Sequence, residues 1–284
     1  GMFGALQRLA AERHRPIPVY AEMGSVNPLF ILPEALAQRG GDIASGLAGS
    51  VAMGCGQFCT KPGVVFLRRD AGFEAFRDQL AGAIAAIPPA VMLHEGILSA
   101  YESGCARLDA ADGVSRLATG EAADGRARAM AFITDLEHLR QQPELADEVF
   151  GPAVLIVVVD AATPFTTVAA DLDGQLTAGI HASDAELSGH AALIHQLEQR
   201  AGRVLFNGFP TGVQVGEAMV HGGPYPATTD SRSTSVGTRA MERFLRPVAV
   251  QDMPAAALPP ALRDDNPLGL PRRVDGIDQP GTRQ

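Results

Sequence analysis

The sequence contains the stretch Gly54-Cys55-Gly56-Gln57-Phe58-Cys59-Thr60-Lys61-Pro62-Gly63, followed by the apolar run Val64-Val65-Phe66-Leu67. A short apolar run bounded by turn residues is typical of a buried strand, and a helical pattern of small residues ends at Gly54. Cys59 is therefore expected on a loop between a helix and a strand. The glycines around it let the backbone turn tightly and point N–H groups at a developing oxyanion.

Extended and helical patterns alternate outward from this stretch. Strands are predicted at 63–67, 127–134, 153–159, 176–181, 203–206 and 244–250. Helices are predicted at 33–39, ending at Gly40-Gly41, then from Asp42 to Gly54, at 73–87, 97–110 and 184–200, with a short helical stretch at 143–149. Near-continuous apolar strands separated by helices predict an α/β fold, in which an open, mostly parallel sheet carries helices on both faces.

Composition excludes several classes of protein. The 284 residues are 46% hydrophobic and carry a net charge of −9, which disfavours nucleic acid and anionic membranes as partners. The longest apolar run, residues 153–159, is too short to span a membrane, and arginines interrupt every apolar stretch near the start that would suit a signal peptide. The three cysteines are an odd number, so we expect reduced thiols in a cytoplasmic protein.

The cysteines admit two interpretations. A cysteine attacks a carbonyl only as the thiolate, which needs help from its surroundings. Alternatively, a free cysteine is a small buried hydrophobe, and this interpretation is favoured for Cys55 and Cys105. For Cys59 taken alone it would also be favoured.

Two carboxylates lie in informative surroundings. Glu22 stands among apolar neighbours, where desolvation would raise its pKa toward the range of a general base; the alternative is a carboxylate at a rim, facing water. Glu148 belongs to an acidic run at 144–148, which is usually a solvated helix face. It is followed by Val149-Phe150-Gly151-Pro152, a tight turn that leads into the strand at 153–159.

Together these segments resemble the catalytic half of the aldehyde dehydrogenase superfamily. The resemblance rests on the segments Glu22-Met23-Gly24-Ser25-Val26-Asn27-Pro28, 54–63, 148–152, 207–212 and 221–232, and it runs from about Pro16 to Asp275. Within the superfamily the α-ketoglutarate semialdehyde (2,5-dioxovalerate) dehydrogenases are the most similar. Ser25 replaces the commoner glycine of the glutamate turn, which is also typical of one subfamily.

The resemblance implies roles for individual residues. Cys59 would be the nucleophile, and Glu22 would activate the water that hydrolyses the thioester. Glu148 would hold the nicotinamide ribose of NAD or NADP, and Phe150 would pack near the nicotinamide ring. The aldehyde channel would be lined by the 221–232 loop and by Phe58 and Thr60. Arg232 could pair with a substrate carboxylate, although a surface salt bridge is an equal alternative.

The resemblance also implies a domain organisation. In the superfamily a nucleotide-binding domain precedes the glutamate, whereas only 21 residues do so here. We therefore expect a linking remnant at 1–21, a catalytic domain at 22–243, an oligomerisation-type strand at 244–252 and a Pro-rich arm at 253–284. The N-terminal nucleotide-binding domain would be absent, and no NAD or NADP would bind this chain alone. The expected partners are a small aldehyde, further copies of the chain, and a separately encoded nucleotide-binding half.

Two hypotheses about function follow. In the first, the chain is the catalytic portion of an NAD(P)-dependent dehydrogenase for a small semialdehyde that carries a carboxylate. In the second, it is a remnant without dehydrogenase activity, either a cysteine-based esterase or thioesterase or an inactive assembly domain. Other chemistries lack their motifs: histidine spacing predicts no metal site, and the sequence has neither G-x-S-x-G nor a phosphate-binding P-loop.

Overall fold

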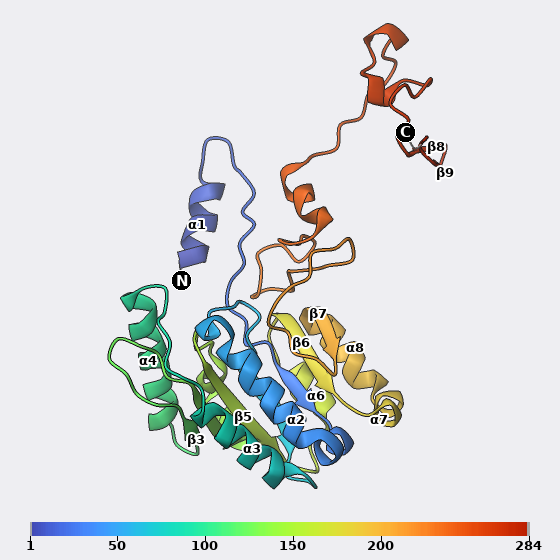
Figure 1. The fold of residues 1–284 in the computed structure, drawn as a ribbon. Coiled ribbons are helices and arrows are strands. Elements are labelled where there is room, and N and C mark those ends of the chain that lie inside the picture. Colours follow the sequence, from blue (N-terminus) through green and yellow to red (C-terminus); the bar gives the residue numbers. More distant parts are fainter. Residues whose placement is uncertain (1, 283–284) are drawn as a thin grey trace. The chain divides into compact units, whose positions relative to one another are not determined.

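The structure is a computed structural model that describes residues 2–282, with side chains from Gly4 onward (Figure 1). The chain divides into two compact units, Gly1–Arg243 and Phe244–Gln284. The larger unit is built on a seven-stranded sheet. The candidate site lies within this unit, so the fold is described from its sheet outward.

The sheet confirms the predicted α/β architecture. Its strand order is β3-β4-β5-β2-β1-β6-β7. All neighbours are parallel except the antiparallel pair β3 and β4. The strands are β1 (Leu29–Ile31), β2 (Val64–Arg68), β3 (Ser115–Thr119), β4 (Met130–Asp135), β5 (Ala153–Val159), β6 (Gln175–His181) and β7 (Ala201–Phe206).

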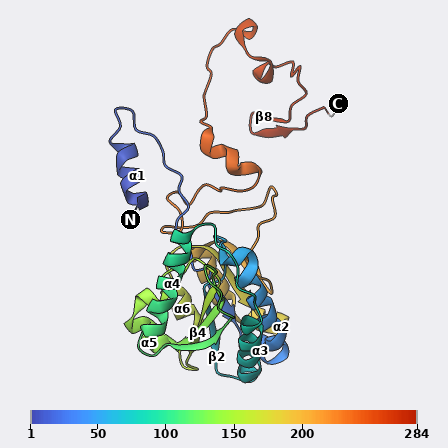
Figure 2. The same cartoon turned by 60° about the vertical axis from the view of Figure 1, so that its left-hand side comes forward.

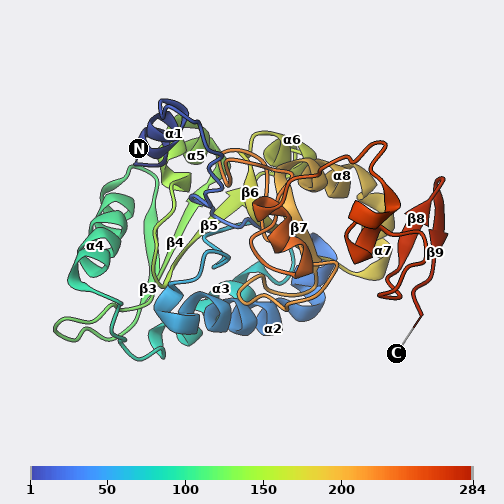
Figure 3. The same ribbon diagram turned by 90° about the horizontal axis from the view of Figure 1, so that it is seen from above.

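Helices cover both faces of the sheet, as Figures 2 and 3 show. One face packs on α2 (Pro33–Ala52) and α3 (Phe73–Ala85), and the other on α4 (Glu95–Ala110), α5 (Leu136–Gln141), α6 (Phe165–Ala170) and α8 (Ala191–Arg200). Side chains alternate along the central strands between two hydrophobic cores. Leu29 faces the α2 core, whereas Phe30 stacks on Phe66 in the other core with ring centroids 5.0 Å apart.

The break predicted between two helices in the stretch from Pro33 to Gly54 is present, as a kink inside α2. Two helical segments meet within α2 at Arg39, whose φ of −135° and ψ of 17° are not helical. At Gly40, the next residue, a Cβ would make only ordinary contacts, 3.4 Å from the backbone oxygen of Gly72 and 3.5 Å from the Cβ of Phe76, so packing against α3 does not require a glycine there.

Other element boundaries differ in detail. The helix expected at 184–200 is interrupted at His190, which separates α7 (Asp184–Gly189) from α8, and Ser183 caps α7 with a capping box. The short helical stretch is a 3-10 turn, η2 (Pro143–Ala146). Strands β1 and β3 and helix α1 (Met2–Ala11) were not predicted from the sequence.

The smaller unit contains two 3-10 turns, η4 (Ala255–Ala257) and η5 (Pro260–Leu262), and a hairpin of β8 (Arg272–Val274) and β9 (Ile277–Gln279). The strand predicted at 244–250 does not form: Phe244 ends the 3-10 helix η3 (Thr238–Phe244), and residues 245–250 have no regular structure. A strand needs a hydrogen-bonded neighbour, so the assembly role of this segment stays a prediction. Among the described residues, no helix is both long enough and apolar enough to span a membrane.

Candidate active site

The candidate site forms at the amino ends of three neighbouring parallel strands. Residues 22–28 lead into β1, residues 57–63 into β2 and residues 148–152 into β5. Because β5, β2 and β1 are adjacent in the sheet, the segments that lead into them meet at one edge. The structure thus brings together the three segments that the sequence singled out.

Left-handed backbone shapes the cysteine loop. After α2 the chain forms η1 (Met53–Gly56), in which Gly54, Cys55 and Gly56 have φ values of 56°, 58° and 66°. A Cβ at Gly56 would lie 2.2 Å from the carbonyl carbon of Gly151, so only glycine fits this contact. The loop that carries Cys59 therefore packs directly against the turn that follows Glu148.

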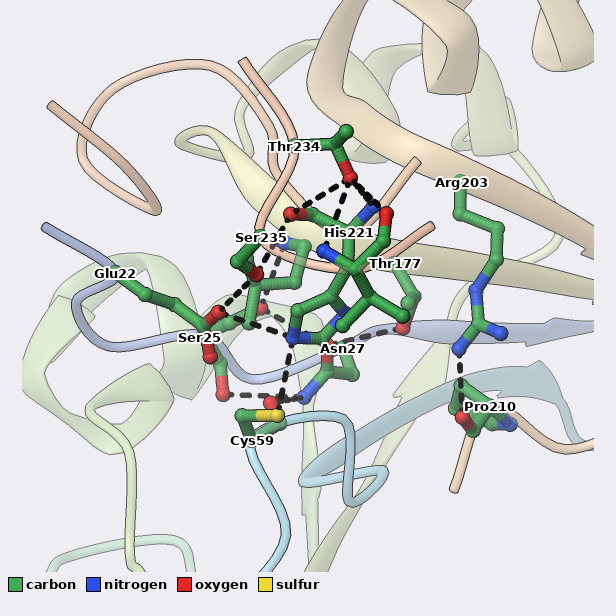
Figure 4. A network of polar contacts seen from close by, with 12 residues as sticks. Glu22, Ser25, Asn27, Cys59, Thr177, Arg203, Pro210, His221, Thr234 and Ser235 are labelled. Atoms are coloured by element: carbon green, nitrogen blue, oxygen red, sulfur yellow. Dashed lines mark hydrogen bonds and ion pairs between the residues drawn. The ribbon is translucent and has the colours of Figure 1, made fainter. Parts of the chain in front are cut away.

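A fully buried asparagine fixes the loop from the other side. The side-chain amide of Asn27 donates to the carbonyl oxygens of Cys59 at 2.8 Å and Lys61 at 3.0 Å. Its Oδ1 accepts hydrogen bonds from the hydroxyl groups of Ser25 at 3.0 Å and Thr177 at 2.9 Å. Asn27 thereby joins the glutamate segment, the cysteine loop and strand β6 through one side chain (Figure 4).

His221 lies between the two predicted catalytic residues (Figure 4). Its Nε2 is 3.2 Å from the Sγ of Cys59 and 3.0 Å from Oε2 of Glu22. One ring nitrogen therefore faces both groups, unlike a relay in which the two nitrogens face different partners. The imidazole is buried, and its backbone N–H donates to the Oγ1 of Thr234 over 2.8 Å.

The electrostatics of this cluster reverse one expectation. Burial acts to raise the pKa of Glu22, but the hydrogen bond and charge of His221, helped by Cys59 and Ser235, hold it below its usual value. The prediction of a raised pKa for Glu22 is thus wrong. Hydrogen bonds with Cys59 and Glu22 raise the pKa of His221 to about 9, so the imidazole is cationic near neutral pH. An imidazolium beside a cysteine is a setting in which reactive thiolates occur.

Sequence reasoning missed His221 as an individual site residue and named only the loop 221–232. Backbone pairing brings this loop to the site: Met23 N–H donates to the Ala227 carbonyl at 2.8 Å, and Thr229 N–H to the Ala21 carbonyl at 3.0 Å. These bonds join segments about two hundred residues apart. A single histidine in a glycine-rich loop carries no local signal that predicts such a contact.

Glu148 lies beside the glutamate turn. It is half-buried, and a Cβ on Gly24 would sit 3.1 Å from its Oε2. Burial raises the pKa of Glu148, and the charge of Lys61 opposes that rise. Phe150 is 36% exposed beyond it. The structure thus places a carboxylate and an exposed aromatic ring at this edge of the sheet, and their roles toward a nicotinamide ribose and ring stay predictions.

Lys61 is almost completely buried. Its Nζ donates to the carbonyl oxygens of Val149 at 3.1 Å and Ala153 at 2.9 Å, which flank the turn after Glu148. Burial lowers the pKa of Lys61 to about 8, although the charge of Glu148 acts in the opposite direction. The lysine therefore ties the cysteine loop to the Glu148–Pro152 turn.

The predicted substrate residues occupy different surroundings. Phe58 is exposed, and its ring lies over Gly54, where a Cβ would be 2.5 Å from it. Thr60 is buried, and within the described part of the chain its Oγ1 has no hydrogen-bond partner. The Arg232 side chain is 89% exposed and pairs with Asp230 at 3.2 Å. The surface salt bridge is thus present, and a role for Arg232 in substrate binding stays a prediction.

A second arginine was not identified from the sequence. Arg203, on β7, is half-buried; burial lowers the pKa of its guanidinium, and interaction with Cys59 opposes that shift. Its Nη2 donates to the Pro210 carbonyl at 2.7 Å, and its Nε has no partner among residues 2–282 (Figure 4). Arg203 is therefore a half-buried cation whose charge interacts with the nucleophile.

The fold and the cluster define an α/β protein with a thiol, an imidazole and a carboxylate gathered at the amino ends of parallel strands. No protein-family model matches the chain. It is 44% identical over 276 residues to alpha-ketoglutaric semialdehyde dehydrogenase of Acinetobacter baylyi, covering 96% of this chain and 52% of that protein. It is also 44% identical over 274 residues to alpha-ketoglutaric semialdehyde dehydrogenase 2 of Azospirillum brasilense, with the same shares covered.

A solved structure shows the same fold. Gamma-glutamyl-gamma-aminobutyraldehyde dehydrogenase from Burkholderia cenocepacia superposes with a TM-score of 0.69 at 20% identity, over 85% of this chain and 48% of that one. Sequence and fold agree, and the chain belongs to the aldehyde dehydrogenase superfamily. It spans about half the length of the curated relatives it matches.

Proposed function

We propose that this chain supplies the nucleophile and the base of an NAD(P)-dependent aldehyde dehydrogenase. The substrate is a small semialdehyde that carries a carboxylate, similar to α-ketoglutarate semialdehyde. The observation that carries the proposal is the contact of Cys59 and Glu22 with one histidine nitrogen, at 3.2 and 3.0 Å. The two relatives that are 44% identical to the chain support the substrate class.

In this proposal each side chain of the cluster carries one step. Sγ of Cys59 attacks the aldehyde carbon and forms the C–S bond, while His221 stabilises the thiolate as a cation. Glu22 then takes a proton from water, which attacks the acyl carbon of the thioester and breaks the C–S bond. The lowered pKa of Glu22 keeps the carboxylate ionised and able to accept this proton.

The nicotinamide cofactor, when bound, accepts the hydride that leaves the aldehyde carbon. Glu148 would hold its ribose and Phe150 its ring, since both lie at the same edge of the sheet as Cys59. Lys61 supports this part of the site, because its ammonium group holds the carbonyls on both sides of the Glu148–Pro152 turn. The other contacts of a dinucleotide would come from a nucleotide-binding domain, and the working protein would be a homo-oligomer.

The substrate class can be tested on the chain itself. α-Ketoglutarate semialdehyde should slow the alkylation of Cys59 at lower concentrations than pentanal, which has a similar length and no carboxylate. Equal protection by the two aldehydes would refute the substrate class. Oxidation of the aldehyde with NAD⁺ and with NADP⁺ is measured on protein isolated from its source cells. If neither cofactor supports oxidation there, the proposed dehydrogenase activity is refuted.

A second candidate activity rests on the same cluster. Cys59, His221 and Glu22 all lie in this chain, and thiol-based hydrolysis of an activated ester requires no cofactor. We infer slow esterase activity with 4-nitrophenyl acetate that is lost in Cys59→Ala. An acyl group transferred to Cys59 but never released would instead show that the cluster lacks a functioning base.

A further inference from the structure

Three different donor groups converge in the cluster. The Sγ of Cys59, the Nε2 of His221 and a carboxylate oxygen of Glu22 all lie within 4.8 Å of one another. Sulfur, imidazole nitrogen and carboxylate oxygen are together the donors that zinc and related borderline-soft cations prefer. We propose that these three residues form a binding site for one divalent cation of this class, and that the bound cation reversibly blocks the nucleophile.

The geometry needs little adjustment. In a tetrahedral zinc site, bonds of about 2.3 Å to sulfur and 2.0–2.1 Å to nitrogen or oxygen put neighbouring donor atoms about 3.5 Å apart. In the structure Nε2 of His221 is 3.2 Å from the sulfur and 3.0 Å from the carboxylate oxygen. The two pairs that include the histidine therefore have to separate by only about half an ångström. The sulfur and the carboxylate oxygen lie within 4.8 Å of each other, so the three donors can surround one ion.

Neighbouring groups already orient the donors, as second-shell groups do in metal sites. The hydroxyl group of Ser235 donates to Oε2 of Glu22 at 3.3 Å, and Thr234 accepts the backbone N–H of His221. Asn27 holds the carbonyl of Cys59 at 2.8 Å. Cys59 and Glu22 are half-exposed, so a cation can enter from solvent and keep its fourth position for water.

Binding of the cation releases protons and leaves every oxidation state unchanged. The cation takes lone pairs from sulfur, nitrogen and oxygen, while the thiol proton and the proton on Nε2 pass to solvent, with no change of oxidation state. The sulfur lone pair that would attack an aldehyde or an alkylating reagent is then occupied. This effect does not depend on the proposed dehydrogenase activity, because the three ligands belong to this chain.

The test titrates the purified, untagged chain with ZnCl₂ and measures alkylation of Cys59 by iodoacetamide through peptide mapping. Zn²⁺ should protect Cys59 at a stoichiometry of one per chain, a chelator should restore its reactivity, and Mg²⁺ should have no effect because it prefers oxygen ligands. Co²⁺ should give a thiolate-to-metal absorption band. Unchanged alkylation at saturating Zn²⁺ would overturn the proposal.

Variants separate this site from adventitious binding. Loss of a group that only orients a ligand costs roughly 10–100-fold in metal affinity, so His221→Gln and Glu22→Gln should weaken Zn²⁺ binding by at least that factor. Cys59→Ser should abolish the Co²⁺ band. The matched control is His195→Gln, which removes an exposed histidine 3.7 Å from Glu198 and should change nothing. Equal binding by all four variants would show that Zn²⁺ binds elsewhere, and circular dichroism confirms that each is folded.

Discussion

The side-chain amide of Asn27 donates a hydrogen bond of 2.8 Å to the carbonyl oxygen of Cys59. The two residues are 32 positions apart, and the bond holds the cysteine loop against the segment that begins at Glu22. Asn27 has φ of 48°, a left-handed conformation that asparagine tolerates better than most residues. Position 27 therefore combines a backbone requirement with a hydrogen-bonding one.

Asn27→Asp should isolate the donor from the rest of the side chain. The variant keeps the size and the Oδ1 acceptor but turns a carboxylate oxygen toward the carbonyls of Cys59 and Lys61. Leaving buried acceptors unpaired costs about 1–3 kcal/mol each, so urea unfolding should show a loss of at least about 2 kcal/mol. Asn27→Ala should be at least as destabilised. Wild-type stability in Asn27→Asp would mean that the amide is not what holds the loop.

The three thiols should differ in reactivity. Cys59 is half-exposed beside an imidazolium, whereas Cys55 and Cys105 are buried. Burial raises the pKa of both buried thiols, that of Cys105 to about 11. Brief iodoacetamide treatment should therefore label Cys59 more than about tenfold faster, because each unit of pKa above ambient pH lowers the thiolate fraction about tenfold. Peptide mapping measures this, and equal labelling of all three would contradict an assembled nucleophile site.

Acid should destabilise the protein through His181. Burial, reinforced by the charge of Arg39, lowers the pKa of this histidine to about 4. An unfolded histidine titrates near about 6.5, so between these values only the unfolded state binds the proton, and stability falls as pH decreases. The loss from pH 7 to pH 5 should be about 2 kcal/mol.

Urea unfolding of His181→Asn at both pH values checks this pH dependence. The variant should lose about 2 kcal/mol less than the wild type between pH 7 and pH 5, whatever its stability at pH 7. His195→Asn, which changes an exposed ring, should behave as the wild type does. The same acid loss in His181→Asn and wild type would assign the effect to other groups.

Arg203 should attract anionic reagents to the nucleophile, and Arg232 should not. A half-buried cation near the thiol changes the local potential by about 1 kcal/mol for a unit charge, which is about fivefold in rate. The ratio of iodoacetate to iodoacetamide alkylation at Cys59 should therefore fall about fivefold in Arg203→Met. It should stay unchanged in Arg232→Met, whose side chain is 89% exposed. If the ratio instead fell in Arg232→Met and stayed unchanged in Arg203→Met, Arg232 would be the residue that attracts a substrate carboxylate.

Sequence patterns predicted the sheet where strands were long and apolar, as in β5 and β6. They missed β1 because three residues after a proline give no periodicity, although this strand is central and completely buried. They missed β3 because it is a partly exposed edge strand with a polar composition. The break at Gly40-Gly41 was predicted from glycine's helix-ending tendency, and α2 is kinked one residue earlier, at Arg39.

In the candidate site, sequence motifs identified Cys59 and Glu22 because each residue stands in a recognisable local segment. His221 could not be found in this way, since its function depends on tertiary contacts with both. The sign of the Glu22 pKa shift depends on the same missing partner: burial alone raises the pKa, and only a neighbouring imidazolium lowers it. The burial of a carboxylate can be estimated from its neighbours in the sequence. The residue that pairs with its charge cannot, because that residue is distant in the chain.

Lys61 is the single lysine in the 284-residue sequence, and it is 3% exposed. The folded chain therefore presents no lysine amine at its surface, despite its many arginines. Enzymes that attach acyl groups or small proteins to lysine would find their target only after the turn at 149–153 had opened. For the same reason, an amine-reactive probe at Lys61 would report how often the cysteine loop separates from that turn, with no engineered label.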